Sequence, residues 1–302
     1  MNFQEIRWDD IAWIDPLIRE NQYKSSEYCF SNLYNWRKIY KTEVAQAHGL
    51  GIVRSKAAGG SYLYPFGKGE VLAAIEEMVG CSAQRGESFC MFGVPEEGAQ
   101  QLKAAFPGRF VFQYDRAHCD YLYAAEKLRE LKGKKLHAKR NHINKFKENN
   151  PDWEYQPITP ENIELCRQLN QVWYGEKEEA SSGLAEERQA VETALNHFWG
   201  EGLEGGLLLA GGKAVGYSFG QPLDEQVFIV HAEKAFSQVQ GAYPMLNQQF
   251  ALHHCGGCQY INREDDMGVE GLRRAKESYY PDQMVEKYAA VWTRSAGEGC
   301  CP

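Results

Sequence analysis

The stretch GLLLAGGKAVGYSFGQPLDEQVFIVHAEKAFSQVQGAY (residues 206–243) decides the fold expected for this chain. Its apolar runs predict three successive strands, at residues 206–210, 214–220 and 226–233. The pair Gly211-Gly212 is typical of the tight turn of a β-hairpin. A glycine-containing loop at residues 237–243 follows the third strand and precedes a predicted helix at residues 244–254. This order of strand, loop and helix indicates a layer in which helices pack on a sheet.

Strands and helices alternate over the rest of the chain as well. After the helix at residues 244–254, the sequence predicts a strand at residues 259–262, a helix at residues 268–279 and a final strand at residues 283–292. The first half shows a similar alternation, which includes a hairpin at residues 44–54. We therefore expect an α+β (mixed α/β) fold.

Helix-breaking residues lie at the middle of the chain. The run Asn149-Asn150-Pro151 ends a predicted helix. The length of 302 residues suits about two domains. We expect an N-terminal domain of residues 1–150, ending in a basic helix, and a C-terminal domain of residues 151–302.

Positive charge is concentrated in residues 127–147, KLRELKGKKLHAKRNHINKFK. This stretch holds nine Lys or Arg residues against the single acid Glu130, so it carries +8, whereas the whole chain carries −8. A local field of this size attracts partners that are rich in phosphate or carboxylate groups. The alternative is an ordinary solvated helix face.

An amphipathic helix is expected within this stretch, at about residues 134–148. Its apolar face consists of Leu136, Ile143 and Phe146. Arg140 lies on the same face, and a guanidinium directed inward needs an anionic partner. That partner is either a carboxylate of the protein or a phosphate or carboxylate of a ligand. His142 is expected to face solvent or to contact phosphate.

Composition excludes several classes of protein. A hydrophobic fraction of 43% is enough for buried cores, so the chain is not disordered. Residues 1–20 lack the apolar run of a signal peptide, and no window has 18 uninterrupted apolar residues, so we expect a cytoplasmic chain without a membrane helix.

One cluster has metal-like spacing: His253, His254, Cys255 and Cys258. It has no second ligand pair, and we expect no metal site.

The order of elements from residue 206 onward resembles the core of the GNAT-type acyl-CoA N-acyltransferases. In that fold, the loop before the central helix binds the donor's pyrophosphate through backbone amides. Gln238 and Gly241 fit the loop pattern Arg/Gln-x-x-Gly-x-Gly/Ala, but Tyr243 takes its last small position. Since a tyrosine would crowd a phosphate, acetyl-CoA is the less favoured donor.

A second resemblance extends over nearly the whole chain. It rests on FSNLYNW (residues 30–36), LYPFG (63–67), DYLY (120–123), LKGKKLHAKRNHINKF (131–146) and NREDDMGVEGLRRAKESYYP (262–281). These segments resemble an uncharacterised bacterial family related to the C-terminal catalytic domain of phosphatidylglycerol lysyltransferases and, more distantly, to FemX-type aminoacyltransferases. The resemblance implies two tandem GNAT-like domains with a site between them, and aminoacyl-tRNA as the donor. We expect the donor site in the C-terminal domain.

The candidate site residues follow from both arguments. Lys276 matches a lysine that these relatives place near the transferred group. The run from Asn262 to Asp266 follows a strand and precedes a helix, and its three acids are expected to raise one another's pKa and to bind an ammonium group or act as a base. Alternatively, they stabilise the helix dipole. His231 and Glu233 end the long predicted strand, and one or both of them are candidates to face the site. The alternative for His231, which the sequence favours, is a strand-end histidine whose hydrogen bonds are satisfied. The candidate catalytic residues are Lys276, Asp265 and Glu233. The candidate substrate-binding residues are Arg140, His142, Asn262, Arg263, Glu264, Gln238, Gly241 and Tyr279.

Three functions remain open at this point. The first is aminoacyl transfer from charged tRNA to an amine or hydroxyl of a lipid headgroup, a peptide or a small molecule, with the basic stretch meeting tRNA phosphates. The second is an acetyl-CoA-dependent N-acetyltransferase. The third is a non-catalytic protein of the same fold that binds a ligand or RNA.

Overall fold

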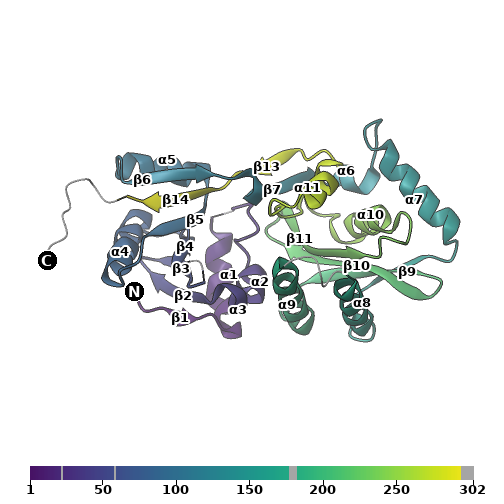
Figure 1. Ribbon diagram of the computed structural model, residues 1–302, viewed down its shortest axis with the longest axis horizontal. Coiled ribbons are helices and arrows are strands. Elements are labelled where there is room, and N and C mark those ends of the chain that lie inside the picture. Colours follow the sequence, from purple (N-terminus) through teal and green to yellow (C-terminus); the bar gives the residue numbers. More distant parts are fainter. Residues whose placement is uncertain (22, 58, 177–181, 294–302) are drawn as a thin grey trace. The chain divides into compact units, whose positions relative to one another are not determined.

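A computed structural model describes residues 1–21, 23–57, 59–176 and 182–293 (Figure 1). The chain divides into two compact units. Unit 1 comprises Met1–Cys119 together with Val285–Pro302, and unit 2 comprises Asp120–Met284. Each unit is built around one seven-stranded sheet, so the expected mixed α/β class is confirmed. No helix in the described part of the chain is both long enough and apolar enough to span a membrane.

The sheet of unit 1 has the strand order β1-β2-β3-β4-β5-β14-β6. Its strands are β1 (Gln4–Glu5), β2 (Thr42–Ala47), β3 (Leu50–Ser55), β4 (Ser61–Leu63), β5 (Cys90–Val94), β6 (Phe110–Tyr114) and β14 (Tyr288–Trp292). Its α-helices are α1 (Ile11–Arg19), α2 (Phe30–Asn35), α3 (Arg37–Tyr40), α4 (Val71–Gln84) and α5 (Glu96–Ala105). Apolar residues of α4 and α5 form one buried cluster with the sheet, and those of α1 and α2 form another. The sheet is therefore covered on both faces.

In unit 1, the Tyr28 side chain bridges the carboxyl ends of the parallel strands β4 and β5. The Tyr28 hydroxyl lies 3.1 Å from the carbonyl oxygen of Tyr64 and 3.0 Å from that of Gly93. In the loop before α4, the amide of Lys68 donates to a Glu20 carboxylate oxygen at 2.9 Å. A carboxylate of the same unit thus caps an amide of the loop before α4.

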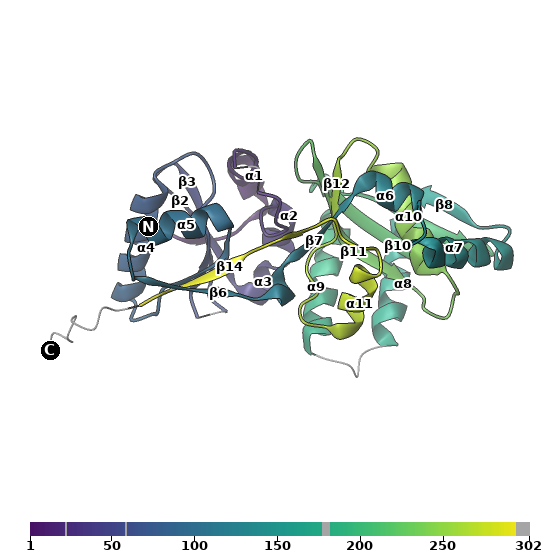
Figure 2. The same cartoon turned by 90° about the horizontal axis from the view of Figure 1, so that it is seen from above.

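The sheet of unit 2 has the strand order β13-β7-β12-β11-β10-β9-β8. Its strands are β7 (Asp120–Ala124), β8 (Glu154–Pro157), β9 (Glu204–Ala210), β10 (Lys213–Pro222), β11 (Val227–Ala235), β12 (Tyr260–Asn262) and β13 (Gln283–Val285). Its helices are α6 (Ala125–Glu130), α7 (His137–Asn149), α8 (Ile163–Gly175), α9 (Ser182–His197), α10 (Ala242–His254) and α11 (Glu270–Glu277). Helices α8 and α9 cover one face, and α10 covers the other (Figures 1 and 2).

Side chains of β9 show why this sheet is apolar on both faces. Leu208 joins the cluster under α10, whereas Leu207 and Leu209 join the cluster under α8 and α9. Successive residues of a strand point to opposite faces, so a strand buried on both sides is a continuous apolar run. The predicted hairpin between β9 and β10 is confirmed.

Two expectations about chain organisation need correction. The boundary between the units lies at Cys119 and Asp120 rather than near residue 150, because β7 pairs with β12 and brings the basic helix α7 into unit 2. The single strand expected at residues 283–292 is two strands. The first, β13, lies beside β7 in unit 2, and the second, β14, pairs with β5 and β6 in unit 1.

Candidate functional site

The site of unit 2 is built where two parallel strands separate. β11 and β12 are paired only from Val227 to Ile229, although β11 continues to Ala235. The register of β11 against β10 also shifts, so that His231 is an extra residue between two paired positions. Such a bulge bends a strand and re-aims its side chains, and it is common beside active sites. Residues in the part of β11 beyond Ile229 therefore lie near the residues that follow β12.

Glu233 and Arg263 form the buried centre of this site. The Arg263 guanidinium donates to one carboxylate oxygen of Glu233 at 3.0 Å, and Asn247 of α10 donates to the other at 2.9 Å. The two charged side chains are only 10% and 12% exposed. The guanidinium also lies 4.9 Å from the ring centre of Tyr279, which is a cation–π arrangement. An ion pair this deeply buried is expected to hold a fixed geometry.

Lys276 reaches the same region from α11. Its ammonium donates to the carbonyl oxygen of Arg263 at 2.6 Å and to that of Asp265. Burial, and then repulsion from Arg263, lower the pKa of Lys276 to about 8, while the nearby acids Glu264 and Asp265 act in the opposite direction. This lysine can therefore lose or gain a proton near neutral pH.

His231 and Glu264 form a second pair in the site. The Nδ1 atom of His231 lies 2.9 Å from a carboxylate oxygen of Glu264. Glu264 has a φ of 56°, in the left-handed region that is unusual for a side chain of this size. Its amide donates to the Asn262 side chain at 2.7 Å, and Asn262 in turn donates to Asp120 at 2.9 Å. These hydrogen bonds hold Glu264 in its uncommon conformation.

Asp266 has a structural role instead of sharing a raised pKa with its neighbours. Arg273 donates to both of its carboxylate oxygens, at 2.9 and 3.0 Å, and the Tyr121 hydroxyl donates at 2.6 Å. Burial opposes the charge of Asp266, but these donors lower its pKa well below the usual range. The expectation that the three neighbouring acids raise one another's pKa is therefore wrong for Asp266.

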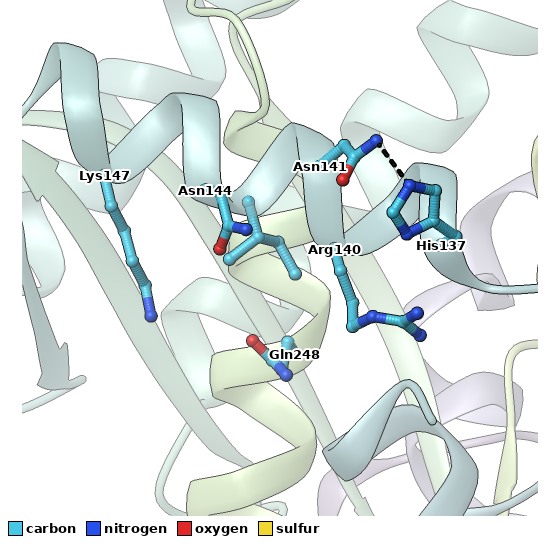
Figure 3. A pocket seen from close by; sticks show the side chains of 7 residues that line it. His137, Arg140, Asn141, Asn144, Lys147 and Gln248 are labelled. Atoms are coloured by element: carbon cyan, nitrogen blue, oxygen red, sulfur yellow. Dashed lines mark hydrogen bonds between the residues drawn. The ribbon is translucent and has the colours of Figure 1, made fainter. Parts of the chain in front are cut away.

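The remaining sequence-predicted residues lie outside this cluster. Arg140 donates to the carbonyl oxygens of Leu131 and Gly133 and so bonds to the preceding turn instead of a carboxylate. It lines a pocket of about 250 Å³ between α7 and α10. Figure 3 shows Arg140 and Lys147 at opposite ends of this pocket, with Gln248 facing them.

Three further candidates lie along α7 and the loop before α10. His142 is exposed, and its carbonyl oxygen packs against Gly241. Gln238 is also exposed, and it donates to Glu176 at 3.4 Å. These residues do not join the cluster around Glu233. Among the described residues, no three His, Cys, Asp or Glu side chains gather as a metal site.

Lys139 was not expected from the sequence, but it belongs to the cluster. Its ammonium lies 4.0 Å from the ring centre of Tyr279. Burial, and then repulsion from Arg263, lower the pKa of Lys139 to about 8, against the opposing effect of Glu233. Lys139 is three residues after Leu136 and four before Ile143. The same helical spacing therefore places it on the buried face of α7. Its position therefore had a signal in the sequence.

Comparisons with known proteins identify relatives of the whole chain. The model of the family described as phosphatidylglycerol lysyltransferase, C-terminal, matches residues 19–291. A conserved protein of unknown function from Bacteroides thetaiotaomicron VPI-5482 is 38% identical, and its structure matches with a TM-score of 0.93 over 97% of this chain and 100% of that one. An uncharacterised protein of Mycoplasmoides gallisepticum is 25% identical over 174 residues, or 56% of this chain. The chain spans about half, 54%, of that curated relative.

Two other solved structures share the fold at low sequence identity. L-PGS from Bacillus licheniformis is 15% identical and matches with a TM-score of 0.60 over 91% of this chain and 94% of that one. FemX is 9% identical and matches with a TM-score of 0.61 over 96% of this chain and 97% of that one. The tandem GNAT-like fold expected from the sequence is confirmed by these matches.

Proposed function

Because the chain belongs to the family of the phosphatidylglycerol lysyltransferase C-terminal domain, we propose that it is an aminoacyltransferase. It moves an aminoacyl group from charged tRNA to an amine or hydroxyl of a lipid headgroup, a peptide or a small molecule. The observation that carries the proposal is the family match over residues 19–291. The cluster of Glu233, Arg263 and Lys276 in unit 2 is the proposed site of transfer.

The buried charges of this cluster suit acyl transfer. When a nucleophile attacks an ester, negative charge develops on the carbonyl oxygen, and fixed donors in a water-poor site stabilise it. Arg263 and Lys276 are buried cations with fixed partners in the structure.

Helix α7 argues against coenzyme A as the donor. A Cβ atom on Gly241 would lie 2.2 Å from the carbonyl oxygen of His142, so α7 packs directly on the loop before α10. The side chain of Asn149 also donates to Gln240 of this loop at 3.3 Å. A pyrophosphate needs the space in front of such a loop. The contacts of α7 with the loop therefore support tRNA over acetyl-CoA.

The solvent-facing side of the basic stretch suits RNA. Its exposed lysines are Lys132, Lys134, Lys135, Lys145 and Lys147. Lysines that neutralise phosphates release counterions, so affinity for RNA falls as salt is raised. Binding of tRNA is accordingly expected to weaken by at least about tenfold between 50 and 200 mM salt if three or more phosphates are contacted.

The proposal is tested by incubating the purified chain with a set of separately charged tRNAs. We expect one of them to lose its amino acid faster than it does alone, and more so when lipid extract or cell-wall peptide is added. Lys276→Met should remove this activity while the protein stays folded. No effect on any charged tRNA would contradict the proposal, and a rise in melting temperature with acetyl-CoA would favour an acetyltransferase instead.

A further inference from the structure

His231 has a buried ring nitrogen whose hydrogen-bonding capacity is unused. Its Nδ1 atom is paired with Glu264 at 2.9 Å, whereas its Nε2 atom is inaccessible to solvent and has no hydrogen-bond partner among the described residues. The side chain as a whole is 8% exposed. Most buried polar atoms are hydrogen-bonded, and an exception calls for an explanation such as a catalytic role.

The backbone at both members of this pair is irregular. His231 is the extra residue of the bulge in β11, and Glu264 has a φ of 56°. Bulges and left-handed non-glycine residues cost stability, and they persist where the surrounding structure holds them, often at active sites. The first irregularity lies within β11 and the second lies just after β12, and the imidazole and the carboxylate come within hydrogen-bonding distance.

Two other titratable groups of the site, Glu233 and Lys276, are already engaged in hydrogen bonds. Both carboxylate oxygens of Glu233 accept hydrogen bonds, from Arg263 and Asn247. The Lys276 ammonium donates to two backbone carbonyls. A neutral imidazole whose Nδ1–H is held by a carboxylate presents the lone pair of Nε2, which is the arrangement that a general base requires.

We propose that His231, oriented by Glu264, is the general base of the transfer reaction; this inference rests on the proposed aminoacyl transfer. Nε2 takes the proton of the acceptor amine or hydroxyl as that group attacks the ester carbonyl carbon. The new N–C or O–C bond forms, the ester bond to the ribose oxygen breaks, and Nε2 returns the proton to that oxygen. Protons and electrons balance within the two substrates. Glu264 stabilises the imidazolium that exists between the two proton transfers.

The test compares His231→Ala with His254→Ala. His254 is a matched control, because it is 10% exposed, its Nδ1 lies 3.3 Å from Glu204, and its Nε2 is also buried without a hydrogen-bond partner among the described residues. Transfer from the charged tRNA found to be the donor is measured for wild type and both variants. We expect His231→Ala to lower the rate about 10²–10⁴-fold, as for loss of a general base, and His254→Ala to change it less than about threefold.

Two additional measurements separate catalysis from folding. Exogenous imidazole should restore part of the rate of His231→Ala and none of the rate of Lys276→Met. Glu264→Gln keeps an acceptor for Nδ1–H but removes the charge. It should lower the transfer rate about tenfold, which is less than the effect of His231→Ala. Full activity of His231→Ala, or a loss without imidazole rescue in a variant that melts like His254→Ala, would overturn the inference alone. Failure of the wild type to transfer from any charged tRNA would overturn it together with the proposed function.

Discussion

Lys276 has a buried ammonium group, and its lowered pKa makes stability depend on pH. The pKa is about 8 in the folded chain, against an ordinary value of 10.5, chiefly because burial disfavours the charge. Between these two pH values the unfolded chain binds more protons, so stability rises with pH in this range. Relative to Lys276→Met, the free energy of unfolding of the wild type is expected to increase by up to about 3 kcal/mol between pH 8 and 10.5.

Urea denaturation of both proteins from pH 7 to pH 10.5 measures this difference. Lys139 also has a pKa lowered to about 8, but it is present in both proteins and cancels in the comparison. A difference that stays constant with pH would show that Lys276 keeps its proton in the folded state.

Arg140 and Lys145 lie on the same helix but differ in what they bond to. Arg140 connects α7 to the carbonyls of the turn before it, whereas Lys145 is exposed and paired with Glu148 at 3.2 Å. We expect Arg140→Ala to destabilise unit 2 by about 1–3 kcal/mol, since two carbonyls lose a charged donor. Lys145→Ala should change stability by less than about 0.5 kcal/mol. Equal losses in urea denaturation would contradict this ordering.

The candidate site could be predicted in part from the sequence. Residues 262–264 lie where β12 ends and Glu233 lies near the end of β11, and local pattern alone indicates that such residues gather at one edge of a sheet. Asn247 comes from α10, the element after β11, whereas Tyr123 comes from β7. The proximity of Tyr123 depends on the pairing of β7 with β12, which has no local signal. The carbonyl partners of Arg140 depend on the left-handed Leu131 and Gly133, which reverse the chain before α7.

At the scale of the elements, α7 packs closely on the loop before α10 at Gly241. A methyl group there would meet the carbonyl of His142, and the φ of 81° would also be strained for alanine. We expect Gly241→Ala to cost about 2–4 kcal/mol. Gly202 has a φ of 68° and no atom within 4 Å of an added Cβ, so Gly202→Ala should cost only about 1 kcal/mol.

Thermal unfolding of the two variants measures the difference between them. Because both glycines are left-handed, the comparison isolates the packing of α7 from backbone strain. Equal melting temperatures would mean that α7 shifts easily enough to leave room for the pyrophosphate of coenzyme A in front of the loop.

Element order was easier to predict than strand partners. The strands around the Gly211-Gly212 turn were predicted because hairpin turns and apolar runs are local signals. The division of residues 283–292 into β13 and β14 was missed because each piece is short and pairs with strands far away in sequence. The same limit explains the boundary expected at residue 150: the break after Asn149 is real, but it ends a helix and not a domain.

At the scale of the whole molecule, the two units differ in how the chain builds them. Unit 2 is one continuous segment, whereas the sheet of unit 1 needs β14 between β5 and β6. A fragment of residues 120–284 should therefore fold alone and unfold cooperatively. A fragment of residues 1–119 should not, because β14 pairs with both β5 and β6, and its removal leaves each of them with an unpaired edge. Dispersion of amide NMR signals and urea denaturation of both fragments measure the outcome.

A third fragment provides the control for this comparison. Joining residues 285–293 through a flexible linker to residues 1–119 restores the missing strand, and folding should return. A well-folded fragment of residues 1–119 without that addition would show that β14 is dispensable to unit 1.

The position of β14 also determines the order in which the two units can complete folding during translation. Domains commonly fold as they emerge, the N-terminal one first. Here residues 1–119 leave the exit tunnel before residues 288–292 are translated, so unit 1 cannot be completed until all of unit 2 has been translated. At about 5–20 residues per second, translating the intervening 120–284 segment takes roughly 10–30 seconds. During that interval the edges of β5 and β6 are open to chaperones, and unit 2, though synthesised later, is the first to be completed.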